Sequence, residues 1–193
     1  MTGDGIPWEI VPYKREYAVA YALKWADRRN PLFYEFDGLG GDCTNFVSQC
    51  LYAGCGIMNE TPTYGWYYHS PEDRAPAWSG VEELYKFLIG VPEFAEANGG
   101  TGPFATNAAT SRKVELGDVI QLSNEEGRFY HTLIISGFTD NDILICAQSD
   151  DALDRPLSTY NYAGIRVLHI EGARLNFDTE RSFNDLINGV ALV

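Results

Sequence analysis

The sequence predicts an α+β fold, because its first half carries helical patterns and its second half carries strand patterns. Aromatic and apolar residues recur at helical spacing over residues 13–29 and again from residue 43 onward. From residue 118 the pattern changes to short runs rich in Val, Ile, Leu and Tyr, which is typical of strands. We therefore expect helices packed on an antiparallel sheet. A chain of 193 residues can build one full core, so we expect a single domain over residues 1–193.

The first predicted helix spans residues 13–29 and ends at Asn30-Pro31, because the position before a proline disfavours helical geometry. Residues 32–41 form a loop rich in glycine and aromatic residues that leads to Cys43. The helix carries an aromatic stripe, which we interpret as core rather than as a ligand platform: Tyr17, Ala20, Tyr21, Lys24 and Trp25.

The second predicted helix begins at Cys43, directly after this loop. Asp42 is expected to cap its N-terminus and Gly54 its C-terminus. Apolar residues follow at i+3, i+4, i+7 and i+8, namely Phe46, Val47, Cys50 and Leu51. This spacing places Cys43 on the buried stripe, at the first turn.

Residues 55–79 are predicted to be irregular because three prolines interrupt them. Long ordered loops are often functional, so the aromatic residues here either wall a substrate groove or cover the core. The candidates for the groove are Trp66, Tyr67 and Trp78. The pattern Ser-Gly-Val-Glu at residues 79–82 is typical of a capping box and predicts a helix through Leu88. A second loop is expected over residues 98–111.

Four strands are predicted, over residues 118–122, 128–138, 142–149 and 165–170. Residues 124–127 and 139–142 have the composition of hairpin turns. The last residues show less pattern, although a short helix is expected over residues 183–186. We place the core of the domain at residues 13–174 and a C-terminal extension at residues 175–193.

The chain carries a formal net charge of −13 without any block of like charges. This charge disfavours nucleic-acid and anionic-membrane partners, because phosphate binding depends on clustered Lys and Arg. No apolar run approaches the ~20 residues needed to cross a bilayer. Residues 1–12 lack the basic and apolar parts of a secretory signal. We therefore expect a cytoplasmic location, or an extracellular one if an export signal has been removed.

The sequence contains no cofactor motif and no pattern of metal ligands. Its four cysteines are too few for a disulfide framework, and no Cys-x-x-Cys pair suggests structural zinc. Cys43 and Cys50 could not pair along one helix, because seven residues rise ~10.5 Å. A phosphate-binding glycine loop is also missing. We expect neither a metal nor a cofactor.

Cys43 has two interpretations. A helix N-terminus presents unpaired backbone N–H groups and a partial positive charge, which lower the pKa of a thiol and favour a nucleophilic thiolate. The same N–H groups can receive a developing oxyanion. Alternatively, Cys43 is a small core residue, since free cysteine is often buried.

A cysteine nucleophile needs a base within reach, and His131 is the candidate among three histidines. Folding a hairpin about residues 140 and 141 brings His131 opposite residues 148–150. Strand parity then places His131, Gln148 and Asp150 on one face of the sheet. That face also carries apolar residues that could pack on the helix of Cys43: Leu133, Ile135, Leu144 and Cys146.

Four motifs together resemble those of the putative amidase domain family: GDCTNFVSQ at residues 41–49, GDVIQ at 117–121, YHTLI at 130–134 and DRPLS at 154–158. That family is similar to the NlpC/P60 and CHAP hydrolases of the papain-like cysteine peptidase superfamily. The resemblance covers about residues 13–174. It implies a papain-like α+β fold, in which the nucleophile helix packs on an antiparallel sheet that bears the histidine. It also implies hydrolysis of an amide or peptide bond.

The resemblance further implies that Cys43 is the nucleophile and that His131 is first a base toward the thiol and then an acid toward the leaving amine. Gln148 would orient His131. The family pattern has a histidine at that position, and a neutral glutamine can accept the imidazole N–H but adds no charge. Asp150 or Asp151 could supply that charge.

The oxyanion site is placed at the helix tip, at Asp42 and Cys43, with the backbone N–H of Cys43 as one donor. Papain-like enzymes have a glutamine six residues before the cysteine. This chain has Asp37 there, and an ionised carboxylate cannot donate a hydrogen bond. The second donor stays open.

The leading hypothesis is a cysteine amidase or peptidase acting on small or peptidic amides, such as the stem peptides or the sugar-lactyl amide of peptidoglycan. An acyltransferase would use the same Cys43 and His131. The hypothesis from another class is a catalytically silent module that binds a glycan or a protein through residues 66–78. The sequence does not indicate the oligomeric state.

Overall fold

The structure is a computed structural model, and it describes residues 9–39, 42–108, 114–175 and 180–190. Its helices are α1 Arg15–Trp25, α2 Cys43–Cys55, α3 Pro76–Ser79, α4 Val81–Ile89, α5 Ala95–Asn98 and α7 Glu180–Ile187, with the 3-10 turns η1 Pro92–Phe94 and η2 Leu157–Thr159. Its strands are β1 Glu9–Val11, β2 Gly102–Asn107, β3 Val119–Ser123, β4 Phe129–Phe138, β5 Ile143–Ala147, β6 Ala152–Pro156 and β7 Gly164–Leu175.

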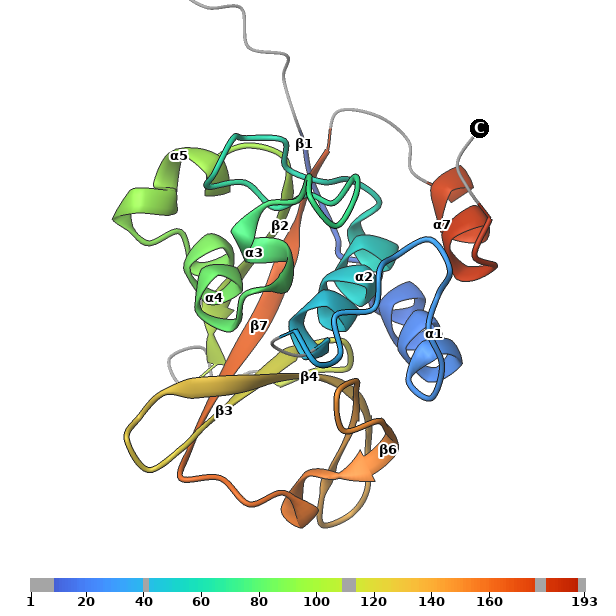
Figure 1. The fold of residues 1–193 in the computed structure, drawn as a ribbon, viewed down its shortest axis with the longest axis vertical. Coiled ribbons are helices and arrows are strands. Elements are labelled where there is room, and N and C mark those ends of the chain that lie inside the picture. Colours follow the sequence, from blue (N-terminus) through green and yellow to red (C-terminus); the bar gives the residue numbers. More distant parts are fainter. Residues whose placement is uncertain (1–8, 40–41, 109–113, 176–179, 191–193) are drawn as a thin grey trace, which may run out of the picture.

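All of the described strands belong to one antiparallel sheet. The strand order is β1-β7-β3-β4-β5-β6, and β2 also pairs with β7. The long strand β7 runs through the middle of the molecule and joins the two ends of the sheet (Figure 1). The predicted α+β fold with an antiparallel sheet is confirmed.

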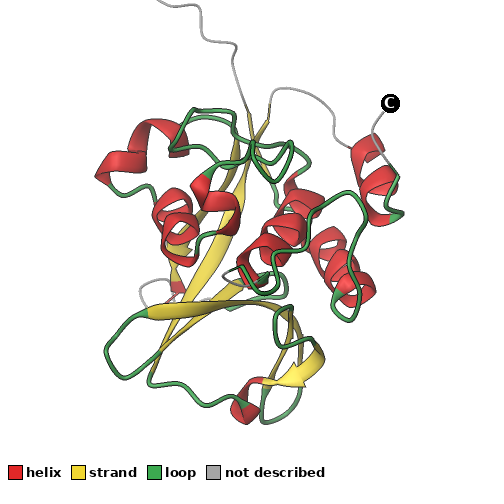
Figure 2. Cartoon of the chain, viewed as in Figure 1, coloured by secondary structure: helices red, strands yellow, loops and turns green. Residues whose placement is uncertain are grey.

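The helices lie on one side of β3 and β4, whereas β6 and η2 lie on the other side (Figure 2). Two apolar clusters correspond to these two sides. The larger cluster, which we call the helix-side core, includes Phe46, Leu51, Trp66, Trp78, Phe87, Ile134 and Cys146. The smaller cluster, the far-side core, includes Ile120, Leu122, Leu133, Ile135, Ile145 and Leu157.

The helix α2 is buried along almost its whole length, as the apolar spacing after Cys43 predicts. It ends at Cys55 and is capped by Gly56, which has the left-handed conformation with φ 71°, so the prediction that Gly54 caps it is wrong. Gly54 instead faces the ring of Tyr13, where an added Cβ would lie 2.1 Å from a ring carbon. A glycine is therefore required at this position for close packing rather than for a turn.

The described part of the C-terminal extension packs on α1. The rings of Tyr17 and Phe183 stack at 3.8 Å between centroids, and the indole N–H of Trp25 donates to the carbonyl of Ile187 at 3.1 Å. Tyr21 and Trp25 of the aromatic stripe of α1 belong to the helix-side core, as predicted, whereas Tyr17, Ala20 and Lys24 are half-buried.

Three strands were not predicted: β1, β2 and β6. The strand β2 lies in a segment that we predicted to be a loop, because glycine and threonine dominate it. It pairs with β7, which is far away in the sequence. Local composition therefore carried no signal for it.

The register of β4 and β5 differs from the predicted one. Near the turn, Gly137 lies opposite Leu144 as predicted, but a β-bulge between Ile135 and Gly137 then shifts the pairing by one residue. Ile135 therefore lies opposite Ile145 rather than Cys146. A shift of one residue exchanges the two faces of a strand. The predicted shared face of Leu133, Ile135 and Cys146 is wrong, because these residues divide between the two cores.

The aromatic segment over residues 55–79 covers the core. Trp66 and Trp78 are fully buried, and their indole N–H groups donate to Ser48 at 2.9 Å and to Asn45 at 2.8 Å. Tyr67 is half-buried and stacks on His69. The prediction that Trp66 and Trp78 wall a substrate groove is wrong, and for Tyr67, which lines neither of the cavities described below, it stays a prediction.

The predicted capping interactions also differ. Asp42 precedes α2, but its carboxylate makes no capping hydrogen bond to the helix backbone. The N-cap position of α4 is occupied by Gly80, which has no side chain, and Ser79 is the last residue of α3, where its hydroxyl accepts a hydrogen bond from Arg74 at 2.9 Å. Among the described residues, no helix combines the length and apolar character that a membrane crossing requires.

Candidate active site

Cys43 and His131 line the same cavity, which has a volume of about 530 Å³. Cys43 is the first residue of α2, and His131 lies near the start of β4. We call this space the Cys43–His131 cavity. Its other lining residues are Tyr130, Ser149, Asp150, Arg155, Thr159, Tyr160 and Asn161. The structure thus brings together the two residues that the sequence predicted as nucleophile and base.

The N-terminus of α2 reaches the start of β4 because the pairing between β4 and β5 ends before it. The pairing stops at Ile134 and Cys146, so the first residues of β4 have no partner in β5. The tip of α2 lies there instead. The Cys43 sulfur lies 3.8 Å from the Thr44 hydroxyl, and the hydroxyls of Thr44 and Thr132 are hydrogen-bonded at 2.8 Å. These contacts fix the thiol beside the backbone of the residue that follows His131.

Cys43 is 5% exposed, and burial raises the pKa of its thiol. Hydrogen bonds from the Thr132 backbone and from Thr44 act in the opposite direction, and the Asp42 carboxylate adds to the increase. The expected lowering of the pKa at the helix tip is therefore wrong, because desolvation outweighs it. The other three cysteines are buried as well.

His131 is 8% exposed, and burial lowers its pKa to about 4. The Asp150 carboxylate raises this pKa and Arg155 lowers it. The ring of Tyr160 lies 5.9 Å from the imidazole, centroid to centroid. The Nε2 atom is buried and has no hydrogen-bond partner among the described residues. Cys43 and His131 are thus a neutral thiol and a neutral imidazole near pH 7.

The predicted hydrogen bond from His131 to Gln148 is absent between these two described residues. The Gln148 amide instead donates to the carbonyls of Trp25 at 2.7 Å and Arg28 at 2.9 Å, which lie at the end of α1. Its Oε1 atom is buried without a partner. Gln148 comes directly after β5, at the start of a turn, so it does not follow the strand parity that we assumed.

The two substitutes for Gln148 lie in different places. Asp150 lines the Cys43–His131 cavity and forms an ion pair with Arg155 at 2.7 Å. Asp151 forms an ion pair with Arg29 at 3.0 Å, outside the cavity. Neither carboxylate forms a hydrogen bond with His131, so Asp150 acts on the imidazole only through its charge.

Sequence reasoning missed Arg29, which lies between four carboxylates. Its guanidinium is 2.7 Å from Asp37, 3.0 Å from Asp151, 3.2 Å from Asp42 and 3.4 Å from Glu35. We call this group the Arg29 cluster. It connects the end of α1, the loop before α2 and the turn after β5. The concentration of acidic residues in that loop is the only sequence signal for it.

The Arg29 cluster explains the two acidic residues near the cysteine. Hydrogen bonds from Arg29 and Ser149 outweigh partial burial and hold the pKa of Asp37 below its usual range. Asp37 is therefore a structural residue, and it does not line the cavity. The backbone N–H of Asp42 donates to the Ser149 hydroxyl and is not free to bind an oxyanion. The prediction that Asp42 belongs to the oxyanion site is therefore wrong.

Comparison with known proteins identifies the family. The model of the putative amidase domain matches residues 12–170. The chain belongs to the putative amidase domain family. This amidase domain contains Cys43, His131 and every described strand except β1 and the end of β7. The family description indicates a hydrolase acting on carbon–nitrogen bonds.

A curated relative of this amidase domain is YhbB of Bacillus subtilis (strain 168), which is described as an uncharacterized protein. It is 31% identical over 143 residues, which are 72% of this chain and 42% of YhbB. The chain thus spans less than half of that relative. No solved structure matches the chain. The papain-like fold and the similarity to NlpC/P60 and CHAP hydrolases therefore stay predictions.

The low pKa of His131 predicts how the stability of the amidase domain depends on pH. The unfolded chain binds a proton at His131 near pH 6.5, whereas the folded chain does so only near pH 4. Between these values the unfolded state binds more protons, so acidification lowers the free energy of unfolding, by roughly 3 kcal/mol. Urea denaturation at both ends of this range should show a smaller loss in His131→Gln than in the unmodified protein. An equal loss in both proteins would show that His131 is not responsible.

The contacts of Gln148 predict a structural role in the amidase domain. Replacing Gln148 with alanine leaves the carbonyls of Trp25 and Arg28 without their donor, which should cost about 2 kcal/mol of unfolding free energy. Gln148→Met keeps the size and should show a similar loss. Turnover per folded molecule should change little, because Gln148 does not contact His131 through a hydrogen bond. A stable Gln148→Met variant with a turnover about 100-fold lower would instead indicate an orienting role.

Proposed function

We propose that this amidase domain hydrolyses an amide or peptide bond through nucleophilic attack by the Cys43 sulfur, with His131 as the base. The observation that supports this proposal is the Cys43–His131 cavity, in which a helix tip and a strand end present a thiol and an imidazole to one space. The two residues lie 88 positions apart in the sequence, so their shared cavity is a property of the fold. Among the described residues, no group of three or more His, Cys, Asp or Glu side chains could hold a metal ion.

The proposed reaction has two halves. In the first, His131 takes the thiol proton while the Cys43 sulfur bonds to the carbonyl carbon. The carbon–nitrogen bond then breaks as the same proton passes to the leaving amine, which leaves a thioester on Cys43. In the second half, His131 takes a proton from water, and the hydroxide attacks the thioester. The acid is released and the proton returns to the thiol.

Because the Cys43 thiol and the His131 imidazole are both neutral, the proposed reaction has no thiolate–imidazolium ion pair at its start. Because the pKa of Cys43 is raised and that of His131 is lowered, an ion pair does not form before the substrate arrives. Proton transfer therefore accompanies attack on the carbonyl. The oxyanion then forms beside the start of α2. The backbone N–H of Cys43 can donate to it, because it makes no hydrogen bond to a described residue.

We propose peptide and amide substrates, with the stem peptides and the sugar-lactyl amide of peptidoglycan fragments as the first class. The cavity volume of about 530 Å³ is in the range of ordinary small-molecule sites. Its lining also combines the Tyr130 and Tyr160 rings with the ion pair of Arg155 and Asp150. Such a lining is suited to a substrate with both apolar and polar groups.

The proposal is tested by product masses. The purified protein is incubated with defined peptidoglycan fragments and with a panel of short peptide amides. Hydrolysis should give two products whose masses sum to the substrate mass plus one water. Transfer of the acyl group to an added amine without hydrolysis would instead indicate an acyltransferase. No product from any substrate, together with no adduct on Cys43, would contradict the proposal and leave a silent binding module.

A further inference from the structure

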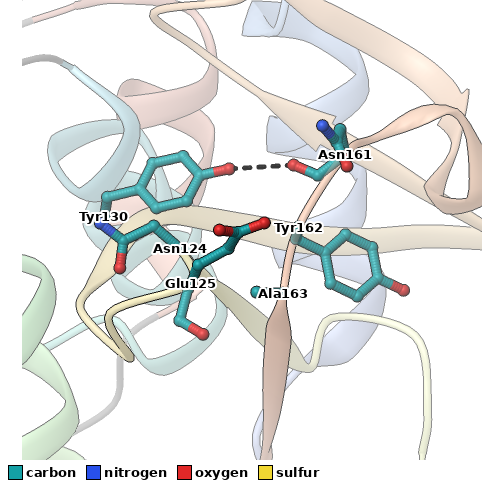
Figure 3. A pocket seen from close by; sticks show the side chains of 7 residues that line it. Asn124, Glu125, Tyr130, Asn161, Tyr162 and Ala163 are labelled. Carbon is teal, nitrogen blue, oxygen red and sulfur yellow. Dashed lines mark hydrogen bonds between the residues drawn. The ribbon is translucent and has the colours of Figure 1, made fainter.

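A second cavity adjoins the Cys43–His131 cavity and shares Tyr130 and Asn161 with it. It has a volume of about 260 Å³ and lies between the turn after β3 and the loop before β7 (Figure 3). The Tyr130 hydroxyl donates to the Asn161 carbonyl at 3.3 Å, and this bond joins the two walls. Because two residues line both cavities, one bound molecule could occupy both.

Glu125 is the only charged residue among those that line the second cavity, which we call the Glu125 cavity. Its side chain points from the turn toward Asn161 and Tyr162, on the opposite wall (Figure 3). The carboxylate forms no ion pair or hydrogen bond with a described residue. The remaining wall is neutral and includes Asn124 and the ring of Tyr162.

This lining suits a cation. A carboxylate and the oxygens of amide and phenol groups accept hydrogen bonds from an ammonium group, and tyrosine rings attract a nearby positive charge. An anionic group would be repelled by Glu125. The volume equals that of roughly nine liquid water molecules, so one residue of a substrate is the size that fits.

We infer that the Glu125 cavity is a subsite that binds an ammonium group of the substrate, close to the amide that Cys43 cleaves. This inference rests on the proposed function, because it takes the neighbouring cavity as the place of the scissile bond. The ammonium group belongs either to a free N-terminus or to a basic side chain. Both sources offer the same chemistry, and the experiment separates them.

The test measures binding to the Cys43→Ala protein, so that no ligand is consumed. The probes are alanyl-alanine amide, its N-acetyl derivative and N-acetyl-lysyl-alanine amide, each titrated at about pH 6.5, where the amino groups are charged. At least one of the two charged probes should bind about fivefold more tightly than N-acetyl-alanyl-alanine amide, and high salt should reduce the difference. The charged probe that binds tightly identifies the source.

Two further substitutions, each made in the Cys43→Ala protein, test whether the preference for charged probes arises in the Glu125 cavity. Glu125→Gln should remove the preference for the charged probes. Glu126→Gln removes an equal charge from the same turn, but Glu126 does not line the cavity, so the preference should remain. Equal binding of charged and acetylated probes, or a preference that survives Glu125→Gln, would overturn the inference. The proposed function is judged separately, from hydrolysis by the unmodified protein.

Discussion

Replacing Cys43 with alanine should lower the rate of amide hydrolysis by about 10⁴-fold or more, because the covalent route is lost with the sulfur. His131→Gln should cause a loss of similar size, since a neutral thiol at a raised pKa needs a base to become nucleophilic. The double variant should be little worse than either single variant, because the two residues act as a unit. The measurement is the turnover rate on a substrate found by the product-mass assay.

Cys55 offers a matched control for the Cys43 substitution. It lies at the other end of α2, and its thiol donates to the carbonyl of Ile57 at 3.2 Å. Cys55→Ser keeps that hydrogen bond and should retain the unmodified rate. If Cys43→Ala kept more than about a tenth of the rate, the sulfur could not be the nucleophile.

Replacing Arg29 with methionine should lower the free energy of unfolding by about 3 kcal/mol or more. Arg29 is only 21% exposed, and its removal leaves the Asp37, Asp42 and Asp151 carboxylates close together without their cation. The Asp42 carboxylate is the most costly, because it is 1% exposed. We expect this loss because an unpaired buried charge is expensive. Urea denaturation at neutral pH measures it.

The adjacent Arg28 provides the control for this prediction. Its side chain is 62% exposed and, among the residues that the structure describes, forms an ion pair only with the exposed Asp27, so Arg28→Met should change stability by less than about 0.5 kcal/mol. The Arg29 cluster also positions the loop that precedes Cys43. Folded Arg29→Met protein should therefore lose turnover as well. Equal stability of the two variants would show that the Arg29 cluster is only a surface feature.

The sequence was sufficient to predict the helix of Cys43 and the strand of His131, and the two residues line one cavity in the structure. The helix follows from apolar spacing, and the strand of His131 from a local run of β-forming residues, so both signals are local. The fold class follows from the order of these signals along the chain. The same reasoning failed for β2, which is held by its pairing with β7 rather than by its composition.

The residues around Cys43 and His131, namely Gln148 and the Arg29 cluster, could not be predicted from the sequence, and the reason differs from that for β2. A bulge between Ile135 and Gly137 shifts the pairing of β4 with β5 by one residue on the side away from the turn, and the residue types of that segment do not predict it. Gln148 lies in the turn after β5, where strand parity does not apply, and it binds the end of α1 rather than His131. The Arg29 cluster joins Arg29 and the loop before Cys43 to Asp151, which lies 122 positions after Arg29, so the cluster forms only when the chain has folded.

The most direct test of the proposed mechanism is the location of the covalent intermediate. The protein is mixed with an activated acyl ester, quenched in acid, digested and mapped by mass spectrometry. We expect a burst of about one leaving group per protein molecule and an acyl group on Cys43. The Cys43→Ala protein should show neither. Turnover of the ester without acylation of Cys43, at a rate that Cys43→Ala retains, would contradict the mechanism.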